Sequence, residues 1–385
     1  MRKNTILLLC SLSFVLINCG KLSPDAAKAQ KYVVDHAVIA HRGTVYWAPE
    51  LTEAAFRWAR NTGADYLELD VQFSKDGVPV IMHDATFNRT TDVAVKFPGR
   101  EKDRINTFTY EEIMQLDAGV RFNEKNADRA CETFTGQDVP VIEDVFRIAE
   151  GKRIKRDAEG KRIFTRSESS EYAFEYEDDP ADNGNRPGVY IEFKEPENFP
   201  GIEQYVYDFL TRTGWNILEG EPVNEKEAAY VGGKVNVGKT CGKVLVQTFS
   251  RDGMANFLTV FKGKLPCSFL VGGKNDFSAE GCDEMIAFAK ATGAQFIGSN
   301  LGEGEKDGMS PMFSQKIRDA GLKCNVYSFN SDEQMEKYFN SGKPLADGMI
   351  TNRTDLTLDF YHAKGARPTG KQGGTPAEVL DALGY

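Results

Sequence analysis

Basic charge is in short supply in this sequence. Its 385 residues include 47 Lys and Arg against 57 Asp and Glu, which gives a net charge of −10 at pH 7. A chain without a basic excess is poorly suited to neutralise a phosphate backbone, so nucleic acid is not expected as a partner. The one strongly basic run, at 151–162, is more typical of a solvated loop than of a binding face.

Cysteine is also scarce, and its spacing fits no metal site. The chain has seven cysteines, none in a CxxC pair, so a zinc site built on cysteine is not expected. Five of the seven lie beyond the N-terminal segment, and an odd number cannot all pair with one another: Cys131, Cys241, Cys267, Cys282 and Cys324. An oxidising compartment would permit a disulfide, but the sequence leaves its partners open.

The N-terminal apolar run is too short to span a bilayer comfortably. "MRKNTILLLCSLSFVLINC" has a basic start, an apolar stretch and then Cys19, which predicts an export signal over residues 1–18. "LINCG" resembles the lipobox of bacterial lipoproteins, although Asn18 stands where a small residue is usual. We therefore expect an exported protein of the periplasm or cell envelope. Lipid on Cys19 would anchor it to a membrane through a polar tether over residues 19–36.

Only four histidines are present, and two of them end apolar runs. His41 follows "AVIA" and His83 follows "VPVIM", whereas His36 and His362 lie in unpatterned polar context. A histidine-poor chain that ends two apolar runs on His is best interpreted as an enzyme, because imidazole is the usual proton carrier near neutral pH.

Short apolar runs alternate with helical patterns from residue 37 onward. The length permits one α/β barrel or two smaller domains. The runs lie at 37–40, 66–73, 78–83, 189–194, 244–249, 267–271, 295–299, 324–329 and 347–351. Helical patterns lie at 51–62, 202–212, 252–262, 283–292, 312–320 and 331–341. Such alternation predicts parallel strands with crossover helices, and eight units make a TIM (β/α)8 barrel, here over residues 37–360.

The ninth run is expected to extend the second strand as a β-hairpin. Runs 66–73 and 78–83 are joined only by "SKDG", which is too short for a parallel crossover. A loop from Ser74 to Gly77 places Phe73 opposite Val78, and His83 then lies opposite Glu68. Asp70 shares that face because strand side chains alternate.

An insertion of the barrel is expected over approximately 85–188. It is charged and rich in Gly and Asn. It contains a helix opened by Thr109 and Glu112 in capping-box spacing and a second short helix at 142–150. Residues 361–385 are expected to form a C-terminal tail.

Polar residues at the strand ends suggest phosphate-ester chemistry. Active sites of such barrels form at the carboxyl ends of the strands. The candidate carboxylates there need a cation to remain ionised together, and Ca²⁺ or Mg²⁺ suits oxygen ligands. Two cations suit an anionic substrate, and two histidines can serve as general acid and base. The set comprises Glu68, Asp70, Glu192, Arg42, Lys194, His41 and His83.

Several motifs resemble the glycerophosphodiester phosphodiesterases. They are "HRG" at 41–43, "APE" at 48–50, "GADYLELDVQFSKDGVPVIMHD" at 63–84, "RTTD" at 89–92 and "IEFK" at 191–194. "TDVAVKFPGR" is similar to the periplasmic, calcium-using branch. The resemblance covers residues 37 to about 355 and implies a TIM barrel with an insertion after the hairpin, in agreement with the interpretation above.

The resemblance also implies residue roles and a reaction. Glu68, Asp70 and Glu192 would bind a divalent cation, with Ca²⁺ favoured and Mg²⁺ possible. His41 and His83 would be the catalytic acid–base pair, with either as the base, and Arg42 and Lys194 would hold the phosphate. The substrate would be a glycerophosphodiester, split into sn-glycerol 3-phosphate and an alcohol. A mechanism proposed for such enzymes uses the neighbouring glycerol hydroxyl as nucleophile and passes through a cyclic phosphate.

The chain departs from the family pattern at some positions. Leu51 follows "PE" where Asn is usual, and Asn352 stands where Asp is frequent. "QTFS", which contains Gln247, replaces "QSFS", and "NVYSFN" offers Tyr327 or Phe329 where Trp is common. Residues considered for the substrate subsite are Tyr46, Trp47, Gln247 and Tyr327.

Two other functions compete with this hypothesis. A phospholipase D-like hydrolase of lysophospholipids or sphingomyelin uses related chemistry, and an exposed apolar rim on the barrel mouth would favour it. A non-enzymatic surface lipoprotein could keep the barrel as a binding module. A complete set of carboxylates and histidines argues against that second alternative, because binding alone needs no acid–base pair.

Overall fold

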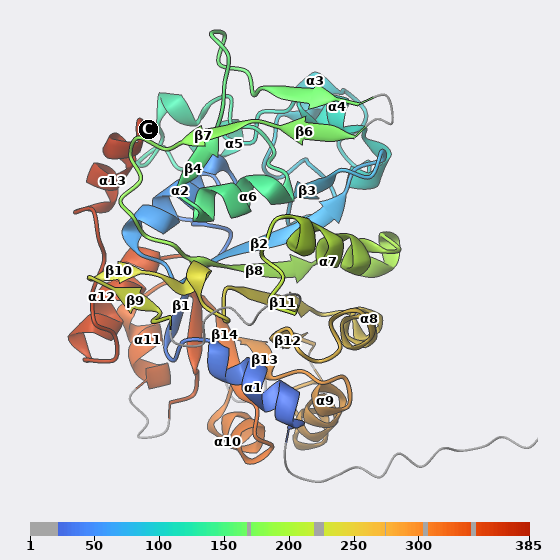
Figure 1. Cartoon of the computed structure of the whole chain (residues 1–385), viewed down its shortest axis with the longest axis vertical. Helices are drawn as coiled ribbons and strands as arrows, with labels where there is room; N and C mark the ends of the chain where they lie inside the picture. The colour runs from blue at the N-terminus through green and yellow to red at the C-terminus, as the bar shows by residue number, and fades with distance from the viewer. Residues whose placement is uncertain (1–21, 168–170, 219–226, 274, 303–306, 340–343) are drawn as a thin grey trace, which may run out of the picture.

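Eight parallel strands form a closed barrel at the centre of the molecule (Figure 1). The computed structural model describes residues 22–167, 171–218, 227–273, 275–302, 307–339 and 344–385. The strands are β1 (Ala37–Ala40), β2 (Tyr66–Phe73), β8 (Gly188–Phe193), β11 (Val244–Thr248), β12 (Cys267–Val271), β13 (Phe296–Asn300), β14 (Lys323–Phe329) and β15 (Gly348–Thr351). Since β1 pairs in parallel with both β15 and β2, the sheet closes on itself. The predicted TIM barrel is confirmed.

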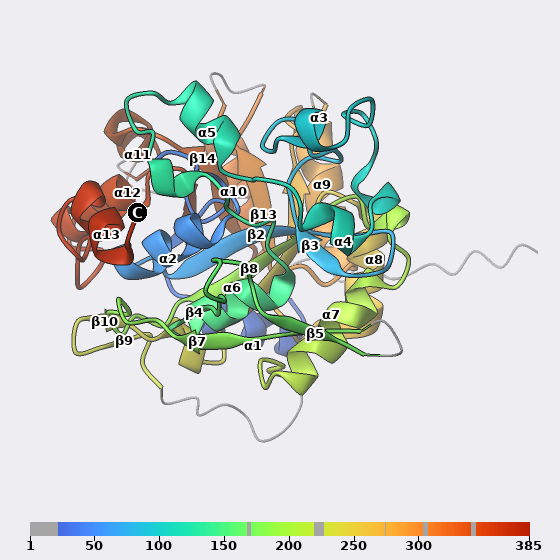
Figure 2. The same ribbon diagram turned by 90° about the horizontal axis from the view of Figure 1, so that it is seen from above.

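Helices surround this barrel, as the views in Figures 1 and 2 show. The barrel strands are near-continuous apolar runs and are fully buried in β1, β11, β12 and β15, as expected when both faces of a parallel sheet are covered. Six covering helices lie close to the predicted ranges: α2 (Glu53–Thr62), α7 (Ile202–Arg212), α8 (Arg251–Phe261), α9 (Ala279–Ala291), α10 (Pro311–Asp319) and α11 (Asp332–Phe339). A further covering helix, α12 (Thr354–Ala363), lies outside those ranges. Hydroxyl side chains cap the amino ends of four of the covering helices, namely Thr52, Ser250, Ser278 and Ser310.

The predicted hairpin is present, but its predicted register is wrong by one residue. β3 (Pro79–Ile81) runs antiparallel to β2, with Phe73 opposite Pro79 instead of Val78. The loop holds three residues, not four, because Ser74 belongs to the ladder. Its N–H donates to the Val78 carbonyl, and its hydroxyl accepts from the Val78 N–H. Gly77, at φ +81°, supplies the left-handed residue with which three-residue hairpin loops close.

His83 nevertheless reaches the barrel mouth. β3 ends at Ile81, and His83 lies in the bend that follows. It lines the same cavity as Glu192 and Lys194. The grouping predicted for Glu68, Asp70 and His83 therefore does not depend on the direct cross-strand pairing that was expected.

The insertion between β3 and β8 forms a layer on one side of the barrel (Figure 1). The Thr109–Glu112 capping box is present, and the helix expected at 142–150 is α6 (Ile142–Ala149). Two small antiparallel sheets, β4 with β7 and β5 with β6, were not predicted. The insertion comprises α3 (Val93–Lys96), η1 (Ile105–Thr107), α4 (Tyr110–Ile113), α5 (Val120–Lys125), η2 (Glu132–Phe134), α6, β4 (Lys152–Ile154), β5 (Phe164–Arg166), β6 (Tyr172–Phe174) and β7 (Tyr176–Asp178).

Both ends of the described chain pack against the barrel. Residues 24–32, expected within a polar tether, form helix α1 (Pro24–Tyr32), in which Ala26 and Ala29 are buried. The Gln30 amide donates to backbone carbonyls of Gln295 and Gly321. The expected tail contains α13 (Pro376–Leu383), which packs on α2. Each of these helices has a short buried apolar face, which the polar composition around it hides.

Some sequence predictions lie outside the described residues. The export signal at 1–18 and Cys19 are among them. Within the described ranges no helix is long and apolar enough to cross a bilayer. The described residues include five cysteines that form no disulfide with one another, and all but Cys131 are buried. Four short elements complete the described chain: η3 (Pro196–Asn198), β9 (Tyr230–Val231), β10 (Lys234–Val235) and η4 (Val237–Lys239).

Candidate active site

Three buried carboxylates meet inside the carboxyl end of the barrel. Glu68 and Asp70 are two residues apart on β2, so their side chains point to the same face of the strand. In the strand register, Asp70 lies beside Glu192 of β8. One oxygen from each of the three lies within 4.8 Å of the others. The structure thus brings together the three residues predicted as metal ligands.

The electrostatics of this cluster fit a site for a divalent cation. Burial, together with Asp70 and Glu192, raises the pKa of Glu68 well above its usual value, and burial also raises that of Glu192. Burial disfavours charge on Asp70 as well, but Lys194 and Arg42 hold its pKa below normal. Neither oxygen of Asp70 accepts a hydrogen bond from any described residue. Buried carboxylate oxygens without donors suit a hard divalent cation such as Ca²⁺ or Mg²⁺.

The two predicted phosphate-binding cations lie beside the carboxylates. Lys194 Nζ is 2.5 Å from Glu192 Oε1 and 3.3 Å from Asp70 Oδ1. The Arg42 guanidinium lies 3.7 Å from Asp70 and 2.9 Å from Glu50. Arg42 has φ +53°, and its backbone N–H donates to Glu68 Oε2 at 2.8 Å. These contacts fix Arg42 directly beside the acidic cluster.

His41 follows β1 and is held by Asn352, which follows β15. Its Nδ1 lies 2.6 Å from Asn352 Oδ1. An amide oxygen only accepts, so Nδ1 carries the proton and Nε2 presents a lone pair. Burial and the neighbouring Arg42 lower the pKa of His41 to about 3. His41 is therefore a neutral imidazole near pH 7.

His83 is the first member of a chain of charged residues that ends at Arg42. Its Nδ1 lies 2.7 Å from Asp84 Oδ1, and Arg89 bridges Asp84 and Glu50 at 2.6 and 2.7 Å. Glu50 in turn pairs with Arg42. The sequence reasoning gave Glu50 and Arg89 no role, although both stand inside the motifs "APE" and "RTTD" that carried the resemblance.

A cavity of about 550 Å³ opens beside these groups at the barrel mouth. His83, Glu192 and Lys194 line its inner part. Its outer part is formed by the segments that follow β8 and β11, and includes Glu195, Glu197, Phe249 and Ser250. The volume is within the range that holds a small organic molecule.

The four residues considered for a substrate subsite are dispersed around the mouth. The Gln247 amide donates to Glu68 Oε1 at 3.3 Å, so it supports a carboxylate. Tyr327 donates to the Val271 carbonyl and packs against Phe249. Tyr46 and Trp47 stack under Arg353 on the His41 side and do not line the cavity described above. Their role in binding the alcohol stays a prediction.

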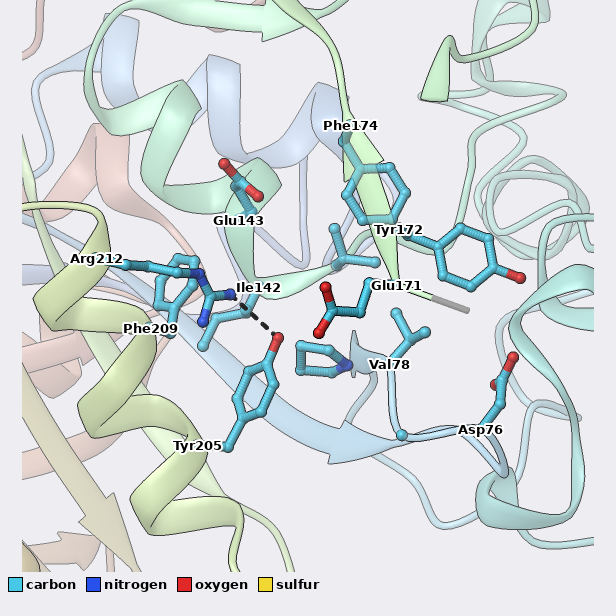
Figure 3. A pocket seen from close by; sticks show the side chains of 13 residues that line it. Asp76, Val78, Ile142, Glu143, Glu171, Tyr172, Phe174, Tyr205, Phe209 and Arg212 are labelled. Carbon is cyan, nitrogen blue, oxygen red and sulfur yellow. Dashed lines mark hydrogen bonds between the residues drawn. The ribbon is translucent and has the colours of Figure 1, made fainter. Parts of the chain in front are cut away.

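A second cavity lies outside the barrel and contains none of the predicted site residues (Figure 3). It has a volume of about 400 Å³ and is bounded by the β2–β3 turn, α6, β6 and α7. Its aromatic walls include Tyr172 and Phe174 on one side and Tyr205 on the other, where Arg212 donates to the Tyr205 hydroxyl at 3.3 Å. This cavity is separate from the acidic cluster.

Comparison with known proteins shows to which class of enzyme this TIM barrel with its acidic cluster is similar. Residues 41–176 match the model of the Glycerophosphoryl diester phosphodiesterase family. A glycerophosphodiester phosphodiesterase of Bacillus subtilis (strain 168) is 26% identical over 360 residues, which cover 92% of this chain and 97% of the relative. Another, from Caldanaerobacter subterraneus subsp. tengcongensis, is 46% identical over 111 residues, covering 29% of this chain and 39% of the relative.

Solved structures agree on the fold. A putative glycerophosphoryl diester phosphodiesterase from Silicibacter pomeroyi DSS-3 has a TM-score of 0.59 at 18% identity, covering 89% of this chain and 98% of its own. An Oleispira antarctica phosphodiesterase in complex with the product sn-glycerol-3-phosphate has a TM-score of 0.54 at 17% identity, covering 85% and 97%. The family match, the relatives and the solved folds agree with the resemblance to the glycerophosphodiester phosphodiesterases, and the prediction of this enzyme class is confirmed.

Proposed function

We propose that this protein hydrolyses glycerophosphodiesters to sn-glycerol 3-phosphate and an alcohol, with a divalent cation and the pair His41 and His83. The observation that carries the proposal is the acidic cluster, flanked by the Arg42 and Lys194 cations, in which neither side-chain oxygen of buried Asp70 accepts a hydrogen bond from a described residue. Both histidines act electrostatically on Asp70, so the two imidazoles lie near this cluster. The product in the Oleispira antarctica structure supports the same reaction.

Glu68, Asp70 and Glu192 would hold the cation. When bound, it would neutralise phosphate charge and polarise the phosphoryl oxygens. Arg42 and Lys194 bind the remaining phosphate oxygens, Arg42 through its planar fork and Lys194 as a point charge. The preference for Ca²⁺ over Mg²⁺ follows from the resemblance to the periplasmic branch.

The hydrogen bonds of the two histidines support one division of roles within this proposal. His41 presents a free Nε2 lone pair, so it removes the proton from the glycerol hydroxyl that attacks phosphorus. His83 has the anionic partner Asp84, which suits a histidine that delivers its proton to the departing alcohol oxygen as the P–O bond breaks. Water then opens the cyclic phosphate with the two roles reversed, and glycerol 3-phosphate leaves.

The test is glycerol 3-phosphate release from glycerophosphocholine by the purified protein. His41→Ala and His83→Ala are each expected to lower kcat at least about 100-fold, the range of general acid–base catalysis. His362→Ala is the matched control and should leave the rate unchanged. Release that persists in both variants refutes the assignment. Cleavage of lysophospholipids or sphingomyelin without any glycerophosphodiester cleavage supports the phospholipase D-like alternative instead.

We also propose that the protein is exported and carried at a membrane by lipid on Cys19. The support is the signal pattern of residues 1–18 and the likeness of "LINCG" to a lipobox. Mass spectrometry of the mature N-terminus is expected to show a diacylglyceryl-modified Cys19. A Cys19→Ala variant should then lose its membrane association, and an unmodified cysteine would contradict the proposal.

A further inference from the structure

The outer wall of the active-site cavity is built by residues that take no part in bond cleavage. It comes from two connections: Glu195 to Glu197 after β8, and Phe249 with Ser250 after β11. Lys194, the proposed phosphate ligand, and His83, the proposed acid, line the inner part of the same cavity. A leaving alcohol bound between phosphate and solvent would therefore contact this outer wall.

Phe249 presents an aromatic face to this space without being buried. Its side chain is 47% exposed, which is unusual for a large apolar residue in this molecule. The ring is held in place by an edge contact with Tyr327 at 6.2 Å. Gly272 leaves room for this pair, because a Cβ at position 272 would lie 3.2 Å from the Tyr327 hydroxyl and 3.5 Å from the Phe249 ring. Lys194 Nζ already lies 5.7 Å from the centre of this ring, so the site accommodates a cation beside it. The part of the ring that stays exposed attracts further cations, especially alkylammonium groups.

The outer wall of the cavity also carries a carboxylate that no cationic side chain among the described residues neutralises. Glu195 is paired with Arg104 at 2.5 Å, and Asp84 is paired with Arg89. Glu197 accepts a hydrogen bond from the Ser250 hydroxyl and has no cationic partner among the residues that the structure describes. Glu197 is thus the one outer-wall carboxylate whose charge is left uncompensated within those ranges.

From these two observations we propose that Phe249 and Glu197 form a subsite for an ammonium group on the leaving alcohol. This inference rests on the proposed function and specifies its substrate class. The enzyme would prefer diesters whose alcohol carries an alkylammonium group over diesters of neutral alcohols with the same glycerophosphate. A merely apolar rim would not distinguish an ammonium from a hydrocarbon of equal shape, so the two explanations predict different selectivity.

The experiment compares substrates that differ in charge but not in shape. We would measure kcat/KM for glycerophosphocholine, for its carbon isostere with a 3,3-dimethylbutyl group, and for glycerophosphoglycerol. The wild-type protein should prefer the choline diester over the isostere by about 3- to 30-fold, the span of a cation–π contact. Phe249→Leu should bring this ratio close to one. Glu197→Gln should lower this ratio by a smaller factor than Phe249→Leu does. Because the carboxylate is exposed, the effect of Glu197→Gln should be larger at low salt than at high salt.

A control variant and two contrary results complete this experiment. Leu258→Ala removes another exposed apolar side chain, on α8, and should leave the ratio unchanged. Equal wild-type kcat/KM for the choline diester and the isostere overturns the inference, as does a Phe249→Leu variant that loses activity on all three substrates equally.

Failure of the proposed function would be recognised separately. If no diester is hydrolysed, calorimetric binding of glycerophosphocholine and of the isostere to His41→Ala protein still measures the subsite. A binding preference for the choline diester that Phe249→Leu abolishes supports the inference even then, whereas equal binding refutes it.

Discussion

At the scale of single residues, the hydrogen-bond partner of His41 determines which ring nitrogen of His41 carries a proton. Asn352 offers an amide oxygen to Nδ1, and burial together with Arg42 keeps His41 neutral. A carboxylate at position 352 would stabilise the imidazolium instead. The amide therefore favours a base that stays unprotonated over a wide pH range.

Asn352→Asp is expected to raise the pKa of His41 from about 3. The base works only when it is neutral. As the pH falls, the variant should therefore lose activity at a higher pH than the wild type does. The pH profile of kcat/KM measures this, with its acid limb moved upward by one unit or more, about 1.4 kcal/mol per unit. Asn330→Asp, one hydrogen bond further away, is the control and should move the limb less. An unchanged acid limb in Asn352→Asp would show that His41 is not the base.

The sequence predicted the candidate site residues better than the residues that support them. Strand-end positions and motifs were sufficient to name Glu68, Asp70, Glu192 and both histidines, which the fold brings together. The supporting role of Asn352 could not be assigned from the sequence, because its contact with His41 depends on barrel closure, which pairs β1 with β15. The ion pair of Glu50 with Arg89 depends on how the loops after β1 and β3 fold over the barrel mouth, which no local pattern predicts.

At the scale of elements, the insertion is fastened to the barrel by a buried ion cluster. Asp179, just after β7, accepts hydrogen bonds from Arg57 and Arg60 of α2 at 2.6 to 2.8 Å. All three side chains are at most 5% exposed. Removing the shared carboxylate would leave two buried guanidinium groups without their main partner.

Asp179→Asn is expected to lower the free energy of unfolding by about 3–5 kcal/mol. Urea denaturation measures the loss. Asp178→Asn is the matched control, since its side chain is 98% exposed, and it should change stability by less than about 0.5 kcal/mol. Equal stability of the two variants would contradict the account of this cluster.

The same cluster has a defined pH dependence. Although burial opposes it, Arg57 and Arg60 lower the folded-state pKa of Asp179 to about 2, below its usual value near 3.8. Its stabilisation is therefore complete above pH 4 and is lost as pH falls from about 4 to about 2. The difference in stability between wild type and Asp179→Asn should shrink over that interval.

The sequence of the β2–β3 hairpin leaves its loop length, and therefore its strand register, undecided. "SKDG" fits either a four-residue loop or a three-residue loop preceded by a paired serine. The backbone and side-chain contacts of Ser74 with Val78 select the second. One residue of difference changes every opposed pair, which is why the strand assignment was right and the register was not.

At the scale of the whole molecule, the C-terminal segment completes the outer layer. The Trp58 indole donates to the Pro376 carbonyl, and the Tyr385 hydroxyl accepts from Arg57. Val379 and Leu383 are buried. The capping box formed by Thr375 and Glu378 could have revealed this helix in the sequence.

Deletion of residues 376–385 should lower the free energy of unfolding by about 3–6 kcal/mol, from two buried apolar side chains at about 1.5–3 kcal/mol each. Leu383→Ala should lower it by about 2–4 kcal/mol in the full chain. Exposed Ala382→Ser is the control and should be near neutral. Thermal unfolding measures all three, and an unaffected midpoint in Leu383→Ala would show that α13 does not contribute to the core.

The most direct measurement is the metal dependence of glycerophosphocholine hydrolysis. We expect EDTA to abolish glycerol 3-phosphate release and added Ca²⁺ or Mg²⁺ to restore it with saturation at one ion per chain. Asp70→Asn protein should remain inactive at the same cation concentrations. Undiminished release from chelator-treated wild-type protein, or from Asp70→Asn, would contradict the claim that three barrel carboxylates hold a cation for this reaction.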